Sequence, residues 1–303
     1  MTEGLEGRIG VTVGICAYNE EQNIGSLLEA LLYQRTEVAR MDEILVVASG
    51  CSDRTPEIVE DFAARNRRIK LLVEERRSGK ASAINQILRA TKGDVVLLES
   101  ADTLPGENAV EFLVRPFLDE SVGVVASRPL PVDDPGTLLG SAVHVQWLLH
   151  HLVSTRIPKT GEMFAFRRVI DSIPDGVGAD EDWIRYSVER EGYSVVYVPE
   201  AVVYNSGPKS LAEFLKQRVR CNVQELYQSR QVSFSTPTWR PGVVWNAFVD
   251  YLFQGDPDLS GLLTFTLLEA LARAYSLLRV RLRAEDLPVW DALPSTKVVR
   301  YRK

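Results

Sequence analysis

Cysteine and histidine are both scarce in this chain, which has three of each among its 303 residues. The cysteines, Cys16, Cys51 and Cys221, are odd in number and widely spaced. This pattern argues against a disulfide framework and favours a reducing compartment. No histidine has a cysteine or an acidic residue at the spacing of zinc ligands, so the sequence also argues against a zinc site.

A secretory leader, a transmembrane run and an excess of positive charge are also missing. The segment MTEGLEGRIG at the start lacks the positively charged beginning and the apolar run of a signal peptide. No window of about 18 residues is both apolar and uncharged, so we expect no transmembrane helix. The net charge of −6 argues against non-specific nucleic-acid binding, because a phosphate backbone selects clustered lysine and arginine. We therefore expect a cytoplasmic protein that does not bind nucleic acid.

Short apolar runs alternate with helix-period segments through the first half of the chain. The runs cover residues 11–17, 44–48, 69–73, 95–99 and 122–126. Near-continuous apolar strands separated by amphipathic helices are typical of a parallel sheet covered on both faces. The sequence thus predicts a Rossmann-like α/β/α sandwich with a mainly parallel central sheet.

Polar segments follow four of these predicted strands. They are residues 17–20, 49–53, 79–85 and 99–103, and three of the four carry acids. Open sheets of this class bind their ligands at the carboxyl ends of the strands. We expect the four segments to line one crevice.

The second half is less regular, with helical patterns, a short strand at 163–166 and a break at 235–242 that contains two prolines and a glycine. We assign residues 1–235 to one domain, with a nucleotide-binding half at about 9–127 and an acceptor half at about 128–235. Residues 236–303 are predicted to form a C-terminal helical extension.

Six segments carry a family resemblance: AYNEE, GCSDRT, GKASAIN, SADT, GADEDW and QRVRC, in that order, within roughly residues 9–225. Their order and spacing resemble the family 2 glycosyltransferases. The resemblance implies the GT-A fold and the inverting transfer of a sugar from a nucleotide-diphosphate sugar. The implied acceptor is a hydroxyl group, such as that of a lipid-linked or polysaccharide intermediate.

In that family, the Asp of a Glu-Asp pair at a helix start deprotonates the acceptor hydroxyl. The resemblance gives Glu181 and Asp182 this catalytic role, with Asp182 as the base. As helix residues alone, the two acids would simply be favourable in a first turn, where the helix dipole stabilises negative charge.

Family members also carry Asp-any-Asp after the fourth strand, and the divalent ion held there neutralises the donor diphosphate. The matching triplet here is Ser100-Ala101-Asp102, so the first acid is missing. The resemblance implies that Asp102 is a metal ligand and that Mg²⁺ or Mn²⁺ is the cofactor, because these hard cations prefer oxygen ligands.

The remaining substrate contacts are also implied by the resemblance. Cys221 stands where the family has a tryptophan, which argues against sugar stacking at that position. The predicted acceptor contacts are Glu162 and Trp183. The predicted donor contacts are Ala17, Tyr18, Asn19, Glu20, Ser49, Lys80, Ser100, Ala101, Gln217, Arg218 and Arg220.

Two other functions stay open from the sequence. A sugar-phosphate nucleotidyltransferase would need a Gly-rich basic loop after the first strand, which residues 17–23 do not provide. A non-catalytic nucleotide-sugar-binding module is favoured by Ser100 and Ala48, which replace acids of the family pattern. The retained Glu181, Asp182 and Arg220 argue against it.

Residues 259–278 form a helical pattern that is apolar over much of its circumference, and basic residues dominate the sequence around and after it. Core packing, a homodimer interface and an interfacial helix are all compatible with this pattern. The last would make the protein a peripheral one at the inner face of the membrane.

Overall fold

The structure is a computed structural model that describes residues 8–232 and 234–282. The basic residues Lys297, Arg300, Arg302 and Lys303 therefore lie outside the described residues.

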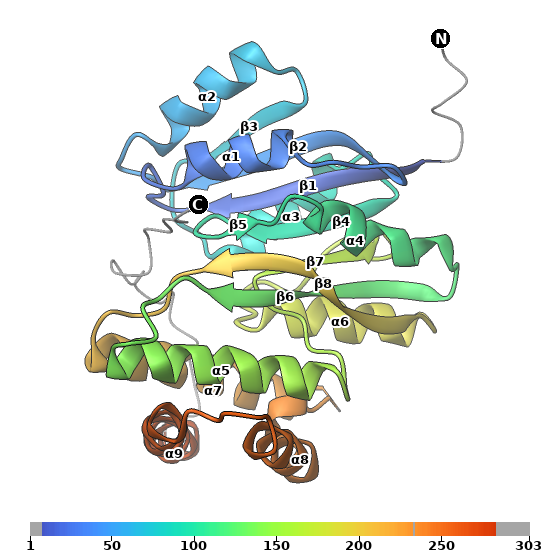
Figure 1. Cartoon of the computed structure of the whole chain (residues 1–303). Helices are drawn as coiled ribbons and strands as arrows, with labels where there is room; N and C mark the ends of the chain where they lie inside the picture. Colours follow the sequence, from blue (N-terminus) through green and yellow to red (C-terminus); the bar gives the residue numbers. More distant parts are fainter. Residues whose placement is uncertain (1–7, 233, 283–303) are drawn as a thin grey trace.

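Within the described ranges, eight strands form one sheet in the order β3-β2-β1-β4-β7-β6-β8-β5 (Figure 1). Strands β1, β2, β3 and β4 are parallel, as are β6 and β8, whereas β7 runs antiparallel between β4 and β6. The predicted α/β class and mainly parallel sheet are confirmed. The strands are β1 (Ile9–Ala17), β2 (Ala39–Ser49), β3 (Ile69–Glu74), β4 (Val95–Ser100), β5 (Leu104–Pro105), β6 (Val122–Pro131), β7 (Met163–Arg167) and β8 (Ser194–Asn205).

Alternation along the buried strands produces two cores, one on each face of the sheet. Val95 and Leu97 pack on one face, whereas Val96 and Leu98 pack on the other, because successive side chains of a strand point in opposite directions. Helices α1, α2 and α4 cover the first face, and α3 and α6 cover the second. Their bounds are α1 (Ile24–Leu32), α2 (Thr55–Arg65), α3 (Lys80–Ala90), α4 (Ala109–Val114) and α6 (Asp180–Arg190).

A further group of helices extends the molecule beyond β6 and β8. Helices α8 and α9 form the outermost layer, separated from the sheet by α5 and α7 (Figure 1). The short helix η2 (Pro237–Trp239) connects α7 to α8, and η1 (Arg115–Leu118) follows α4. The bounds are α5 (Leu138–Ser154), α7 (Leu211–Gln231), α8 (Pro241–Leu252) and α9 (Leu259–Leu282).

The C-terminal helices are tied to the rest of the chain by polar contacts. Thr236 donates a hydrogen bond to Asp182, and Trp239 donates one to Glu225 on α7. Arg218 on α7 forms an ion pair with Glu269 on α9. The division at residue 235 therefore runs through a well-connected region, and the two-part organisation stays a prediction.

Helix α9 is long and apolar enough to cross a membrane, judged by length and composition alone. The sequence predicts no such helix, because Glu269 and Arg273 interrupt the apolar run, and this prediction is wrong by the same measure of length and composition. In the fold these two charges form an ion pair with each other, 2.7 Å apart. A single helix of this kind also occurs in the cores of soluble proteins, but only 28% of the apolar window is buried inside this protein.

Candidate active site

The strand register brings distant segments to one edge of the sheet. Cys16 at the end of β1 is the partner of Ser100 at the end of β4. The Ser100 amide donates to the Glu162 carbonyl oxygen at 3.0 Å, because β7 runs antiparallel to β4 and begins beside its end. Asp102 and Glu162, which are 60 positions apart in the numbering, thereby reach the same place.

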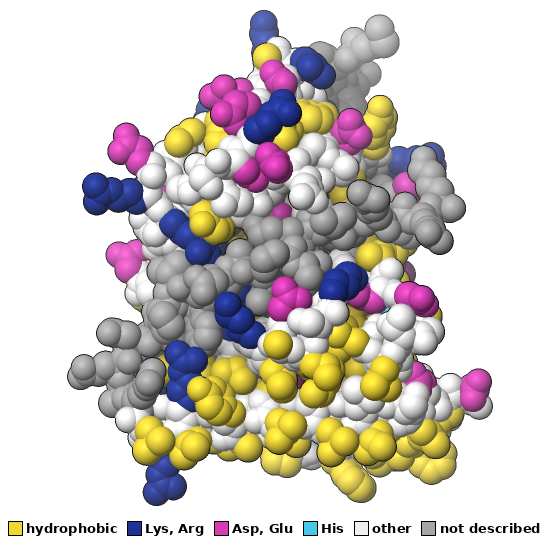
Figure 2. Space-filling model, turned by 90° about the vertical axis from the view of Figure 1, so that its left-hand side faces the viewer, with side chains coloured by type: hydrophobic (Ala, Val, Ile, Leu, Met, Phe, Trp, Pro, Cys, Tyr) yellow, Lys and Arg dark blue, Asp and Glu magenta, His cyan; other side chains and the backbone are white. Residues whose placement is uncertain are grey.

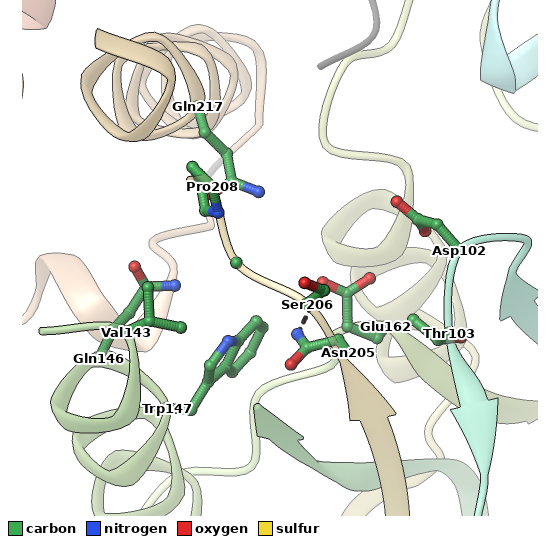
Figure 3. A pocket seen from close by; sticks show the side chains of 11 residues that line it. Asp102, Thr103, Val143, Gln146, Trp147, Glu162, Asn205, Ser206, Pro208 and Gln217 are labelled. Atoms are coloured by element: carbon green, nitrogen blue, oxygen red, sulfur yellow. Dashed lines mark hydrogen bonds between the residues drawn. The ribbon is translucent and has the colours of Figure 1, made fainter. Parts of the chain in front are cut away.

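A polar pocket opens at this edge. Figure 3 shows Asp102 and Glu162 on one side of the pocket, Trp147 of α5 on another, and Gln217 of α7 reaching towards it. The residues that line the pocket are Asp102, Thr103, Val143, Gln146, Trp147, Glu162, Asn205, Ser206, Gly207, Pro208 and Gln217.

The electrostatics of the pocket are dominated by closely placed carboxyl groups. Burial and the nearby Asp102 carboxylate raise the pKa of Glu162 to about 7. Glu99, buried behind the pocket, has its pKa raised well above the ordinary range, first by burial and then by Glu162 and Asp102. Carboxyl groups that raise one another's pKa in this way can also be neutralised by a bound cation.

Lys80 at the start of α3 lies beside these acids. Its Nζ atom is 2.8 Å from Asp180 Oδ2 and 3.9 Å from Glu181 Oε2. Burial lowers the pKa of Lys80, but the carboxylates of Asp180 and Glu181 outweigh it and the net shift is upward. Lys80 therefore stays charged and holds the first turn of α6 against the pocket region.

The first turn of α6 contains three consecutive acids, Asp180, Glu181 and Asp182. Successive helix side chains point about 100° apart, so the three carboxyl groups meet different surroundings. Asp180 is buried against Lys80, and Asp182 is only 1% exposed. The Glu181 side chain is 31% exposed, and its charge is close enough to raise the pKa of Glu162.

Asp182 faces the interior on the α7 side of the site. Thr236 Oγ1 donates to Asp182 Oδ2 at 2.7 Å. Burial raises the pKa of Asp182 to about 6, and the neighbouring Lys159 opposes this shift. The Oδ2 atom thus anchors the segment leading into η2, whereas Oδ1 is buried without a hydrogen-bond partner among the described residues. The role of Asp182 as the base stays a prediction.

Three of the predicted donor contacts are engaged elsewhere. The Glu20 carboxylate accepts from Asn23 Nδ2 at the start of α1, and Ser49 donates to Glu74 at the end of β3. Arg218 points from α7 to α9, where both of its hydrogen bonds go to Glu269. Their side chains thus have partners within the protein, and their roles as donor contacts stay predictions.

The loop after β1 retains donor candidates. Arg77 lies over the ring of Tyr18, 4.0 Å from its centroid, and forms a cation–π pair. Asn19 adopts a left-handed φ of 54°, which asparagine tolerates better than most residues. The Asn19 side chain accepts from the Ser52 amide at 2.8 Å and so joins the loops after β1 and β2.

Other predicted site residues differ in their placement. Ala17 and Ala101 are buried, so they can offer only backbone contacts. Ser100 lines a second, smaller pocket together with Lys80 and Glu162. Arg220 lies three residues after Gln217 on α7, and this spacing puts both on one helix face.

The acceptor predictions are only partly supported. Glu162 lines the pocket, but Trp183 packs against the second core and Tyr186 instead. Trp147 is the tryptophan that faces the pocket, and the sequence analysis did not assign it to the site. Its ring lies edge-on to His150, with centroids 5.3 Å apart.

The sequence model of glycosyl transferase family 2 matches residues 12–168, more than half of the chain. The chain belongs to this family. The predicted family is therefore confirmed. Family membership also removes the nucleotidyltransferase interpretation.

Two curated relatives show how far the likeness extends. The chain is 30% identical over 229 residues to the probable glycosyltransferase YdaM of Bacillus subtilis, covering 69% of this chain and 54% of YdaM. It is 27% identical over 225 residues to the poly-β-1,6-N-acetyl-D-glucosamine synthase of Staphylococcus aureus, covering 70% and 53%. The chain spans about half the length of these relatives.

Solved structures confirm the GT-A fold. One is the mannosyltransferase PcManGT of Pyrobaculum calidifontis in complex with GDP-Man and Mn²⁺, with a TM-score of 0.60, 24% identity and coverage of 91% of this chain and 85% of that one. Another is the glucosyl-3-phosphoglycerate synthase of Mycobacterium tuberculosis with Mn²⁺, UDP and phosphoglyceric acid, with a TM-score of 0.53, 22% identity and coverage of 73% and 78%.

Proposed function

We propose that this glycosyltransferase moves a sugar from a nucleotide-diphosphate sugar to a hydroxyl acceptor with inversion, and that Glu181 is its base. One observation carries the assignment: of the three acids in the first turn of α6, Glu181 alone has a substantially exposed carboxylate. It lies beside Lys80 and near Glu162, which lines the pocket.

The chemistry needs a base on the acceptor side of the sugar. Glu181 takes the proton of the acceptor hydroxyl as its oxygen attacks the anomeric carbon. A bond forms between this oxygen and the anomeric carbon, and the bond from that carbon to the diphosphate oxygen breaks. The electron pair leaves with the nucleoside diphosphate. A single displacement of this kind inverts the anomeric configuration.

Asp102 and Glu162 would hold a divalent cation as a pair, since the described residues contain no group of three or more His, Cys, Asp or Glu side chains that could bind a metal ion. Both are oxygen ligands and both line the pocket, and the pKa of Glu162 is raised first by burial and then by the Asp102 carboxylate. When bound, Mg²⁺ or Mn²⁺ neutralises charge that develops on the leaving diphosphate. Glu162 thus compensates for the acid that Ser100 replaces.

The substrate would occupy the space between two groups of residues. We assign Tyr18 and Asn19 to the nucleoside. We assign Gln217, which lines the pocket, and Arg220 on the same face of α7 to the diphosphate, where an arginine can donate two hydrogen bonds. Trp147 offers an apolar ring for the sugar or the acceptor. A lipid-linked or polysaccharide acceptor and a cytoplasmic location stay predictions.

Binding of donor and cation should appear as thermal stabilisation. A ligand that binds only the folded state at about 100 times its Kd adds about 2.7 kcal/mol of stability. We expect UDP, GDP or a corresponding nucleotide sugar with Mn²⁺ to raise the Tm by several degrees in differential scanning fluorimetry. Glu162→Gln should lose most of the Tm increase that depends on Mn²⁺. Glu57→Gln, at an exposed position in the first turn of α2, should retain this increase. Stabilisation by none of the nucleotides would contradict the proposed donor.

Glu162 should also make the thermal stabilisation by the cation depend on pH. Its folded-state pKa of about 7 lies above its ordinary value, so its proton stabilises the fold at low pH. That contribution is lost as the pH rises through about 7, and a bound cation competes with the same proton. We expect Mn²⁺ to raise the Tm much more at about pH 8 than at about pH 6. An equal effect at both values in the unmodified chain would remove Glu162 from the cation site.

A further inference from the structure

Helices α8 and α9 expose a continuous apolar surface on the outside of the molecule, which we call the outer face. Figure 2 shows apolar side chains gathered along the lower edge, where α8 and α9 lie. Patches of this extent on a soluble protein mark sites of interaction. The exposed side chains of the outer face are Val244, Trp245, Leu252, Phe253, Leu259, Leu263, Leu267, Leu271, Tyr275, Leu277, Leu278 and Leu282.

The α9 part of the outer face carries no exposed charge between Leu259 and Leu278. Leucines recur there at intervals of four residues, a spacing that places them in one stripe along the helix. Twenty residues of helix give a stripe about 30 Å long. The two charged residues within this span, Glu269 and Arg273, form an ion pair and are turned away from it.

The opposite side of α9 is fixed to the protein. Glu269 accepts from Arg218 at 2.7 Å, and Ser276 donates to the Val219 carbonyl oxygen of α7. Asp258, just before α9, accepts a hydrogen bond from Ser141 on α5. Lipid cannot surround a helix that is held on one side by a buried ion pair, so α9 offers one face only.

We propose that the outer face docks the protein on an anionic lipid bilayer, with α9 lying parallel to the bilayer surface. The stripe is mainly leucine, which fits a fluid apolar phase, whereas protein interfaces favour aromatic, methionine and arginine side chains. Trp245 and Phe253 are 65% and 86% exposed, and aromatic rings are typical of the membrane–water boundary. Exposed Arg281 at the end of α9 complements anionic headgroups.

This orientation would place the bilayer close to the pocket. Helices α5 and α7 contact α9, and they also contribute Trp147 and Gln217 to the pocket lining. One layer of helices, about 10 Å thick, therefore separates the pocket from the outer face.

Vesicle flotation of the full chain tests the proposal. The unmodified protein should float with vesicles made of equal parts phosphatidylcholine and phosphatidylglycerol. Leu267→Glu puts a charge in the stripe and should lower the bound fraction at least about tenfold. Leu267 is 57% exposed, so the variant should keep the wild-type Tm, and Leu118→Glu on η1, where Leu118 is 60% exposed, is the matched control. Arg281→Glu should weaken binding to these vesicles about fivefold or more and have little effect on pure phosphatidylcholine.

Two results would overturn the proposal. One is failure of the unmodified chain to float, or equal flotation of Leu267→Glu. The other is a dimer in analytical ultracentrifugation that Leu267→Glu converts to a monomer without any vesicle binding, since the outer face would then be occupied by a second copy. Neither result depends on sugar transfer, so both leave the proposed enzymatic function untouched.

Discussion

Replacing Glu181 by Gln should lower kcat for sugar transfer by about a thousandfold, because general bases contribute roughly 10²- to 10⁴-fold to such reactions. Glutamine keeps the size of the side chain but cannot accept the hydroxyl proton. The first turn of α6 should stay in place, since Asp180 holds Lys80 at 2.8 Å. Donor stabilisation by nucleotide and Mn²⁺ should therefore be unchanged while turnover is lost.

Asp182→Asn is the matched control for this prediction. The amide oxygen of asparagine can still accept the hydrogen bond from Thr236, and the position is buried away from solvent. We expect a loss of turnover below about tenfold, arising from a small displacement of the turn. An inactive Asp182→Asn enzyme together with an active Glu181→Gln enzyme would reverse the assignment and return the base to Asp182.

These two neighbours also show where the sequence stops being informative. The pattern places a pair of acids at a helix start, but it does not say which carboxylate faces the substrate. That choice depends on Thr236, which lies 54 positions further along the chain. Only the packing of the segment before η2 against α6 reveals that Asp182 is covered and Glu181 is not.

The fold was easier to predict because its determinants are local. The apolar runs of β1, β2 and β4 are buried on both sides, and each lies within a strand of the sheet. Strand order left no such local signal. Strand β7 pairs with β4, and this pairing places Glu162 next to Asp102. Glu162 thereby supplies a second acid to the predicted cation site, where Ser100 stands in the position of the first Asp of the family motif.

Arg218 illustrates a different limit. It belongs to the motif that resembles donor-binding residues, yet its side chain is rotated by about 100° around the helix axis from that of Gln217. Gln217 lines the pocket, whereas Arg218 meets a buried acid on α9. A motif gives the residue types, and the helix phase decides which of them reach the ligand.

The ion pair between Arg218 and Glu269 should be one of the largest contributions to the stability of the fold that a single substitution can remove. Burial raises the pKa of Glu269, but the guanidinium groups of Arg218 and Arg273 outweigh it and lower the pKa to about 2. This contribution to stability is present above the ordinary glutamate pKa and disappears as the pH falls through about 2.

Glu269→Leu would leave the Arg218 guanidinium buried without its carboxylate partner. Breaking a buried pair from one side costs about 3–5 kcal/mol, so the free energy of unfolding in urea should fall by that amount. Glu107→Gln, which removes an exposed pair with Arg35 at 3.9 Å, should change it very little. The double variant Arg218→Met with Glu269→Leu should recover most of the loss, since an apolar pair can replace a buried ion pair. If Glu269→Leu cost no more than Glu107→Gln, the pair would not be what fixes α9, and the helix would have to be held by its other contacts with α5 and α7, such as the hydrogen bond from Ser276 to Val219.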